Sequence, residues 1–288
     1  ITLTRIPLKY YRPENAYDHS VLTRLEKIPT NIYESAEEGA FSIAKEIAMQ
    51  IRKKQDAGLN YVIALPGGRS PLGLYKELIR LHKEENLSFK NVIAFVEYEF
   101  YPLASNAAGN IARIKEELLD RIDINPKNVY APDGCMPKDS ILDFCRQYED
   151  QINAVGGIDC MLLGIGNSSN IMFNTAGSNI SSRTRLVLIE GGARKEAARS
   201  FVSQDAVPAG VITMGISTML NAKSVILFAW GEDKSEIIAQ TVEGKISDAV
   251  PSTFLQNHQN AKVVIDLSAA YNLTRISHPW LVTSCEWD

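Results

Sequence analysis

The sequence predicts an α/β fold, with a doubly wound, mostly parallel sheet that carries helices on both faces. Short, continuously apolar runs recur along the chain, as is typical of strands buried on both faces of a parallel sheet. These runs alternate with longer stretches in which apolar residues return every three or four positions, the period of an amphipathic helix. The alternation of the two patterns indicates strand, helix and strand units of a single α/β class.

The bulk properties exclude several classes of function. The chain has 288 residues, of which 45% are hydrophobic and 22% charged, enough for one large domain with a substantial core. A net charge of -4 and a pI near 5.7 argue against nucleic acid as a partner, since binding it requires a concentrated basic face. Apolar runs stay shorter than the roughly 18 residues that span a membrane. We therefore expect neither a nucleic-acid nor a membrane partner.

The cysteines give no sign of a metal site or a disulfide framework. The four cysteines are not closely paired in the sequence and have no neighbouring histidines. Close pairs of cysteines, with or without histidines, are typical of zinc sites, and many cysteines in a short chain are typical of disulfide-rich domains. A reducing cytoplasm fits this usage, and we expect a cytoplasmic protein with no metal and no cofactor. The chain starts at Ile1 and stops without a polar tail, so we expect both ends to be cuts in a longer protein.

The chain divides into an arm, a domain and an extension. Residues 1–33 contain three prolines and no sustained period, and we expect an extended N-terminal arm. The domain should cover residues 34–270, and residues 271–288 should form a C-terminal extension or a linker to a further domain. Ser35-Ala36-Glu37-Glu38 has the spacing of a capping box at the start of a helix. The expected buried positions of that helix, which Gly58 ends, are Phe41, Ala44, Ile47, Ala48 and Ile51.

The remaining elements follow from the same two patterns. The turn after the first strand leads into a helix with Leu74, Leu78 and Leu81 on one face. The other predicted helices are residues 110–122, 139–154, 193–202 and 233–241. The predicted strands are residues 61–65, 92–96, 159–163, 186–189, 225–230 and 263–266.

The loops at the carboxyl ends of the strands are where a ligand should bind in such a sheet. The first is Pro66-Gly67-Gly68-Arg69-Ser70-Pro71. Its glycines let the backbone approach a ligand, and Ser70 would cap a helix that begins at Pro71. The free N–H groups and positive end of that helix would suit a phosphate. A plain strand-to-helix turn uses the same residues, so the motif by itself leaves both interpretations open.

The loop after residue 163 is glycine-rich and polar but contains no acid–base group. Residues 164–182 include no Asp, Glu, His, Cys or Lys, whereas a proton-transfer catalyst needs a group that titrates near its working pH. The four histidines lie outside all of these loops, and structural or solvent-facing roles are favoured for them. Arg199 and Lys234 could belong to an anion pocket or be solvated surface charges.

Several motifs occur together in the order found in one known family. They are residues 65–76, 88–92, 145–149, 164–167, 173–174 and 182–185. Over about residues 35–270 the chain resembles glucosamine-6-phosphate deaminase. Residues 10–16 and 279–287 resemble a longer subgroup in which a deacetylase-like domain follows the deaminase-like one.

The resemblance implies a fold, a ligand and a set of phosphate-binding residues. Members of the family have a Rossmann-like deaminase/isomerase fold and convert glucosamine 6-phosphate to fructose 6-phosphate and ammonia without a cofactor. The implied ligand is therefore a phosphorylated sugar or amino sugar, bound by a protein of carbohydrate metabolism with isomerase or hydrolase chemistry, and a homo-oligomer is a possible assembly. The phosphate-binding residues implied for this chain are Gly67, Gly68, Arg69, Ser70, Arg199 and Lys234.

The catalytic positions implied by the same resemblance are substituted. Tyr98 stands where the family has its proton-shuttling aspartate, and polar residues that do not titrate stand where it has the histidine and two carboxylates that open the sugar ring. Those three residues are Ser168, Asn170 and Thr175. Glu99 is the nearby carboxylate that remains, with either a weak catalytic role or a structural one. This pattern predicts a sugar-phosphate-binding pseudoenzyme.

Two alternatives stay open at this stage. One is an active deaminase or isomerase that uses Glu99 and Tyr98 in a rearranged site. The other is a purely structural domain that supports a fused enzyme.

Overall fold

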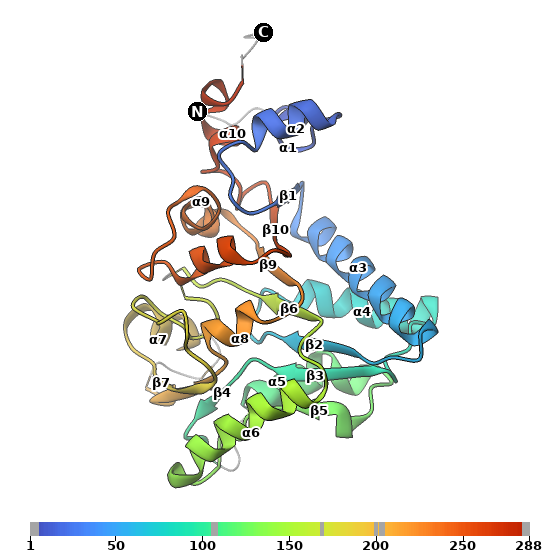
Figure 1. Ribbon diagram of the computed structural model, residues 1–288, viewed down its shortest axis with the longest axis vertical. Coiled ribbons are helices and arrows are strands. Elements are labelled where there is room, and N and C mark those ends of the chain that lie inside the picture. The colour runs from blue at the N-terminus through green and yellow to red at the C-terminus, as the bar shows by residue number, and fades with distance from the viewer. Residues whose placement is uncertain (1–5, 105–108, 168–169, 199–200, 202–204, 284–288) are drawn as a thin grey trace.

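A seven-stranded parallel sheet forms the centre of the molecule (Figure 1), as seen in a computed structural model. The structure describes residues 6–104, 109–167, 170–198, 201 and 205–283. Within them the strand order is β1-β10-β9-β6-β2-β3-β5, and every pairing is parallel. These strands are β1 (Thr30–Tyr33), β2 (Tyr61–Leu65), β3 (Val92–Val96), β5 (Val129–Tyr130), β6 (Cys160–Leu163), β9 (Val225–Ala229) and β10 (Ala261–Asp266). The predicted α/β fold class is confirmed.

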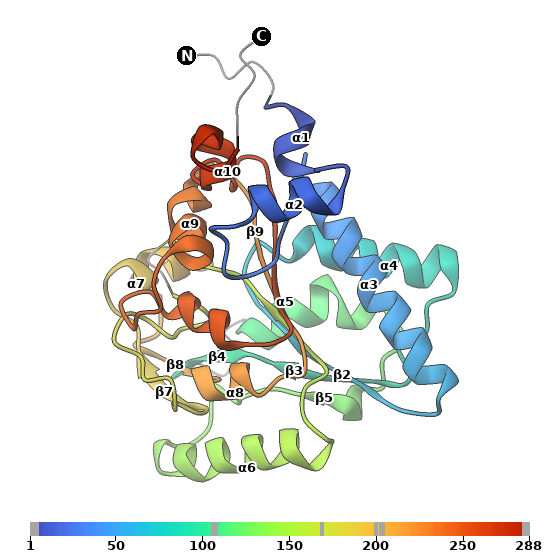
Figure 2. The same cartoon turned by 45° about the horizontal axis from the view of Figure 1, so that its top comes forward.

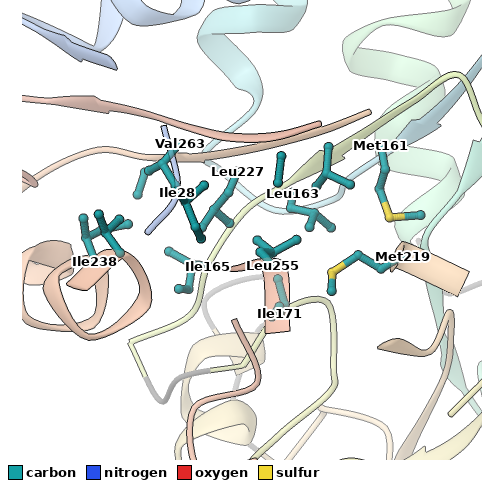
Figure 3. Close-up of a cluster of buried hydrophobic side chains, with 14 of the residues drawn as sticks. Ile28, Met161, Leu163, Ile165, Ile171, Met219, Leu227, Ile238, Leu255 and Val263 are labelled. Atoms are coloured by element: carbon teal, nitrogen blue, oxygen red, sulfur yellow. The ribbon is translucent and has the colours of Figure 1, made fainter. Parts of the chain in front are cut away.

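Helices cover both faces of this sheet, which is why its strands are apolar throughout. Alternate residues of β2 enter different clusters, with Val62 and Ala64 on one face and Ile63 and Leu65 on the other. One face packs under α3 (Ala36–Asp56), α4 (Leu72–Glu85) and α5 (Asn110–Glu117). The other packs under α6 (Ile141–Ala154), α8 (Ile216–Leu220) and α9 (Ser235–Glu243), and Figure 3 shows part of that cluster.

Helix α3 begins as its sequence predicts. The Ser35 hydroxyl accepts a hydrogen bond from the Glu38 N–H at 3.2 Å, and the Glu38 carboxylate accepts one from the Glu34 N–H at 3.0 Å. Both bonds satisfy backbone donors at the start of the helix. The buried face is carried by Ile43, Ala44, Ile47, Ala48 and Ile51. Phe41, predicted on that face, is 42% exposed, and the buried residue at this point of the helix is the neighbouring Ala40.

The predicted strand at residues 186–189 exists but belongs to a second sheet. β7 (Arg185–Leu188) pairs antiparallel with β8 (Gly210–Thr213), which pairs antiparallel with β4 (Tyr98–Tyr101). Phe100, Val211 and Ala193 of α7 (Gly191–Ala198) form a separate small core around it. A short apolar run has the same pattern in either sheet, so its sequence could not assign it.

The prediction of an extended N-terminal arm was wrong for the residues described. That segment contains α1 (Leu8–Tyr11) and α2 (Ala16–Leu22), and its last residues form β1 at the edge of the sheet. Tyr10 and Tyr11 are buried in the main core. Prolines interrupt a long helical period, yet they permit short helices between them.

The C-terminal segment folds back onto the same end of the molecule. Helix α10 (Thr274–Ser277) lies beside α1, as both views show (Figures 1 and 2).

None of the described helices has the length and hydrophobicity that crossing a membrane requires. The 3₁₀ segments described are Leu119–Arg121, Pro126–Asn128, Lys138–Ser140, Glu232–Lys234, Pro251–Asn257 and Pro279–Leu281.

Candidate functional site

A cavity of about 190 Å³ lies beyond the carboxyl ends of four neighbouring strands. Those strands are β9, β6, β2 and β3, which lie side by side in the sheet. Residues 66–70 reach the cavity from the end of β2, residues 97 and 98 from β3, residues 164–166 from β6 and Lys234 from beyond β9. Loops at the carboxyl ends of four strands, the edge at which a ligand is expected to bind, therefore meet in one place. Successive strands of this sheet after β2 are added on one side of it, and those from β6 onward are added on its other side. Ligands of such folds bind at the point between β2 and β6 where this order reverses.

The glycine-rich loop brings bare backbone to the cavity. Gly68 has a φ of +86°, a conformation that side chains disfavour. A Cβ on Gly67 would lie 1.9 Å from Asn110 Oδ1 and 2.5 Å from Tyr98 Oη, so no larger residue fits there. The loop is held by two donors, since Tyr75 Oη donates to the Pro66 carbonyl at 2.5 Å and Trp230 Nε1 to the Ser70 carbonyl at 3.0 Å.

Ser70 was predicted to cap the following helix, and that prediction was wrong. Helix α4 begins at Leu72, with Pro71 at the capping position and no side-chain capping bond. Within the described part of the chain the Ser70 hydroxyl has no hydrogen-bond partner, and Ser70 lines the cavity. Its hydroxyl is therefore available to a ligand, together with the free N–H groups at the start of α4.

Two cationic side chains line the cavity among the residues described. Lys234 is half-buried, and its Nζ donates a hydrogen bond to Asn167 Oδ1, while Asn167 Nδ2 donates to Asp233 at 2.9 Å. Arg69 is exposed at the rim. Arg199, the other predicted phosphate ligand, lies outside the described residues.

Tyr98 occupies the cavity wall beside the glycine-rich loop. Its ring packs edge-on against Phe173, with centroids 4.7 Å apart, and against Phe100 at 5.8 Å. Burial, reinforced by the neighbouring carboxyl groups of Glu97 and Glu99, raises the pKa of the Tyr98 hydroxyl above its usual value. The hydroxyl is therefore a neutral hydrogen-bonding group at physiological pH and cannot take up a proton as a base.

The other substituted positions are only partly assembled around the cavity. Asn170 lines it and is 6% exposed, with Nδ2 donating to the Met172 carbonyl at 3.2 Å. Thr175 is exposed and is not among the lining residues. Ser168 lies outside the described residues. Of these three substituted positions, the cavity is therefore lined by the amide of Asn170, and an amide does not exchange a proton near neutral pH.

Of the two roles left open for Glu99, weakly catalytic or structural, its position favours the structural one. This residue is 1% exposed and does not line the cavity. Its Oε1 accepts hydrogen bonds from the N–H groups of Phe100 at 2.8 Å and Asn110 at 2.7 Å, and its Oε2 accepts one from Ile111 at 2.9 Å. The carboxyl group therefore satisfies free backbone donors at the start of α5, which is a structural role.

Replacing Glu99 should lower stability rather than remove a ligand contact. We expect Glu99→Ala to lower the free energy of unfolding by about 2 to 3 kcal/mol, because buried N–H donors lose a charged acceptor. Urea unfolding measures this, with the exposed Glu116→Gln on the same helix as a control that should stay within about 0.5 kcal/mol. An unchanged unfolding midpoint in Glu99→Ala would contradict the structural role.

Glu97 is the residue that sequence reasoning missed. It directly follows β3, lines the cavity and is 1% exposed. Its Oε1 is buried without a hydrogen-bond partner, and burial raises the pKa of its carboxyl group well above the usual value. A signal was available, since a carboxylic acid placed immediately after a buried strand of a parallel sheet lies at the ligand-binding edge.

Comparison with known proteins places this chain in a family. The family model described as glucosamine-6-phosphate isomerases/6-phosphogluconolactonase matches residues 34–265. A protein of Bacteroides thetaiotaomicron named as glucosamine-6-phosphate deaminase-like is 57% identical over the whole chain, and the chain spans 44% of that relative's length. Glucosamine-6-phosphate deaminase of Shewanella halifaxensis is 40% identical over 226 residues, 78% of this chain and 84% of that relative.

Solved structures show the same architecture. A monomeric glucosamine-6-phosphate deaminase superposes with a TM-score of 0.81 at 33% identity, covering 85% of this chain and all of that one. The 6-phosphogluconolactonase of Thermotoga maritima superposes with a TM-score of 0.64 at 16% identity, over 83% of this chain and 99% of that one, a likeness of fold.

Proposed function

The chain belongs to the family of glucosamine-6-phosphate isomerases and 6-phosphogluconolactonases, and on that premise we propose that its cavity binds phosphorylated sugars, amino sugars among them, without ordinary deaminase catalysis. One observation carries the proposal. The glycine-rich loop, the uncommitted Ser70 hydroxyl and Lys234 meet at the carboxyl ends of adjacent parallel strands.

These groups suit a phosphate dianion. The N–H groups at the start of the fourteen-residue α4 point their positive ends toward the loop that precedes the helix. The Ser70 hydroxyl adds a donor, and Lys234, positioned by Asn167, adds a charge. Hydrogen bonds from a cation to a phosphate oxygen are about twice as strong as neutral ones. The phosphate end of the ligand therefore belongs at this loop.

The remaining wall of the cavity supports binding better than turnover. Deamination with isomerisation needs one group to open the ring and another to move a proton between adjacent carbons. Tyr98 and Asn170 supply neither at neutral pH. An active isomerase or deaminase with a rearranged site is the second candidate, and the buried carboxyl group of Glu97 is the observation that favours it.

Three wider features belong to the same proposal. The relative from Bacteroides thetaiotaomicron is more than twice as long as this chain, which supports a role for the chain as one part of a longer protein. The resemblance of residues 279–287 to a deacetylase-fused subgroup suggests the nature of that further part. A cytoplasmic location and a homo-oligomeric assembly complete the proposal.

Phosphosugar binding can be measured by isothermal titration calorimetry. We expect the chain to bind fructose 6-phosphate and glucosamine 6-phosphate, and Lys234→Ala to weaken both by about 1.5 to 3 kcal/mol, the usual value of a hydrogen bond to a charged group. The family resemblance implies an effect of the same size for Arg199→Ala. The exposed Lys245→Ala is the matched control and should bind normally. Failure of both sugars and of inorganic phosphate to bind at millimolar concentration would refute the proposal.

A further inference from the structure

The backbone of Glu97 is held in place, whereas its carboxyl group forms no hydrogen bond that would stabilise the fold. Its N–H donates to the Leu65 carbonyl at 3.2 Å, and its carbonyl accepts from the Met214 N–H at 2.9 Å. The backbone is therefore held between β2 and the segment after β8. The side chain makes no hydrogen bond and no ion pair within the parts of the chain that the structure describes. An unmade hydrogen bond in the interior costs free energy, and such groups in native proteins call for an explanation.

The cavity provides that explanation, because Glu97 lines it together with the phosphate-binding loop. Gly67, Gly68 and Ser70 lie at the end of the adjacent strand β2, and Glu97 at the end of β3. A ligand held through its phosphate at the loop would extend over the end of the neighbouring strand. The unpartnered carboxyl group is then available to the sugar part of the ligand.

The surroundings of Glu97 favour its uncharged form. The ionisable groups whose own pKa values it raises are three phenols, the buried Tyr75 of α4 and Tyr148 of α6 and the half-buried Tyr98 of β4. None of the three carries a positive charge that would stabilise a carboxylate. Removal from water raises the pKa of the carboxyl group, and no opposing cause accompanies it.

The cations that line the cavity among the described residues do not stabilise a charged Glu97. Arg69 and Lys234 line the same cavity, yet neither forms an ion pair with Glu97. Lys234 instead contacts Asn167. Arg113 of α5 acts on Tyr98 and Glu99 and does not act on Glu97. These surroundings favour the neutral carboxylic acid, which has one donor and one free acceptor.

A neutral carboxylic acid and a sugar hydroxyl are complementary, since each donates one hydrogen bond and accepts another. An ammonium group offers donors alone and would be matched by a carboxylate. Building on the proposed function, we propose that Glu97 recognises the sugar end of the ligand by pairing with a hydroxyl. The site then prefers phosphosugars that present a hydroxyl at this position over those that present an ammonium.

The test compares three ligands in three forms of the protein. Titration calorimetry at pH 7 uses fructose 6-phosphate, glucosamine 6-phosphate and inorganic phosphate with the natural chain, Glu97→Gln and Glu97→Ala. Glu97→Ala should weaken fructose 6-phosphate about tenfold, the loss of roughly 1.4 kcal/mol of hydrogen bonding, and leave inorganic phosphate unchanged. Glu97→Gln should stay within about threefold of the natural chain, because an amide also donates and accepts. Glu116→Gln is the exposed control.

The outcomes separate this inference from the proposed function. Unchanged phosphate binding in both Glu97 variants shows that the cavity is still folded. Sugar phosphates that bind equally well to Glu97→Ala overturn the role of Glu97 and leave the phosphate site intact. A loss in Glu97→Gln that is larger for glucosamine 6-phosphate than for fructose 6-phosphate overturns it in favour of a carboxylate that binds an ammonium. Absence of all binding refutes both proposals.

A pH series provides a second, independent measurement. The affinity of the natural chain for fructose 6-phosphate, divided by that of Glu97→Gln, cancels the ionisation of the ligand's own phosphate, whose second pKa is near 6. If the neutral acid is the binding form, this ratio stays flat until the pH reaches the raised pKa of Glu97 and falls beyond it. A ratio that rises with pH would overturn the proposal, because the carboxylate would then be the binding form.

Discussion

Deamination of glucosamine 6-phosphate by this chain is expected to be absent, or slower by at least about 10³-fold than in a relative that has the family's acid–base residues. Each properly placed acid or base contributes roughly 10² to 10⁴-fold, and the losses do not add fully. The cavity contains a neutral tyrosine and an amide where the resemblance implies a carboxylate and a histidine. Glu97 offers one proton carrier, whereas the reaction needs two.

Steady-state assays of ammonia and of ketose phosphate measure this directly. Substituting Tyr98→Asp, Ser168→Asp, Asn170→His and Thr175→Glu together should restore part of the activity. Tyr98 and Asn170 line the cavity, so we expect those two changes to matter most. Ammonia release by the natural chain at an ordinary rate, on the order of 10 s⁻¹, would contradict the prediction. Its disappearance in Glu97→Gln would then identify the proton carrier.

Arg275→Met is expected to lower the free energy of unfolding by about 3 kcal/mol, the lower end of the range for breaking a buried ion pair. Arg275 Nε lies 2.8 Å from Glu26 Oε1, and the two side chains are 1% and 3% exposed. These atoms are close but are not aligned as a hydrogen bond. Arg275 Nη2 also donates to the Thr30 carbonyl at 2.9 Å. The pair therefore joins the N-terminal segment to α10 and to the edge strand β1.

The pKa of Glu26 explains why the cost should lie at the low end. Burial raises it to about 7, although Arg275 opposes that rise. Without Arg275, Glu26 can take up a proton and need not remain as a buried charge. Urea unfolding at pH 7 measures the loss, and the exposed Arg146→Met is a control that should change stability by less than about 0.5 kcal/mol. A change of that small size in Arg275→Met would contradict the prediction.

The same pair sets a pH dependence whose sign is fixed. The folded-state pKa of Glu26 is raised from 4.5 to about 7, so the folded chain binds more protons than the unfolded chain between those values. The stabilising contribution is complete below pH 4.5 and is lost as the pH rises through about 7. Glu26→Gln removes this titration, and the difference in unfolding free energy between it and the natural chain should change over that window.

Local patterns were sufficient to predict most of the central sheet. Residues 61–65 and 92–96 were expected as strands and form β2 and β3 with those bounds. The reason is that a strand buried on both faces is apolar at every position, and a capped amphipathic helix is recognisable within its own residues. The loop at residues 66–70 could be located for the same reason, because it follows directly from the end of such a strand.

Pairing and packing between elements far apart in the sequence could not be predicted in this way. The strand at residues 186–189 was found, but its membership of a second, antiparallel sheet depends on β4 and β8. The first 33 residues show no sustained hydrophobic period, whereas the burial of Tyr10 and the contact with the distant Arg275 organise the part of them that the structure describes. Edge strands and short helices gain most of their stability from such tertiary contacts.

The two glutamates after β3 show most clearly what the sequence determined and what only the tertiary structure decided. The sequence placed carboxyl groups at positions 97 and 99, at the ligand-binding edge of a parallel sheet, and its family motifs indicated which acids were missing. The structure decided that Glu99 satisfies the start of α5 and that Glu97 lines the cavity unpaired. The chain leaves the parallel sheet at this point to enter the antiparallel one, so the surroundings of each side chain depend on elements far away in sequence.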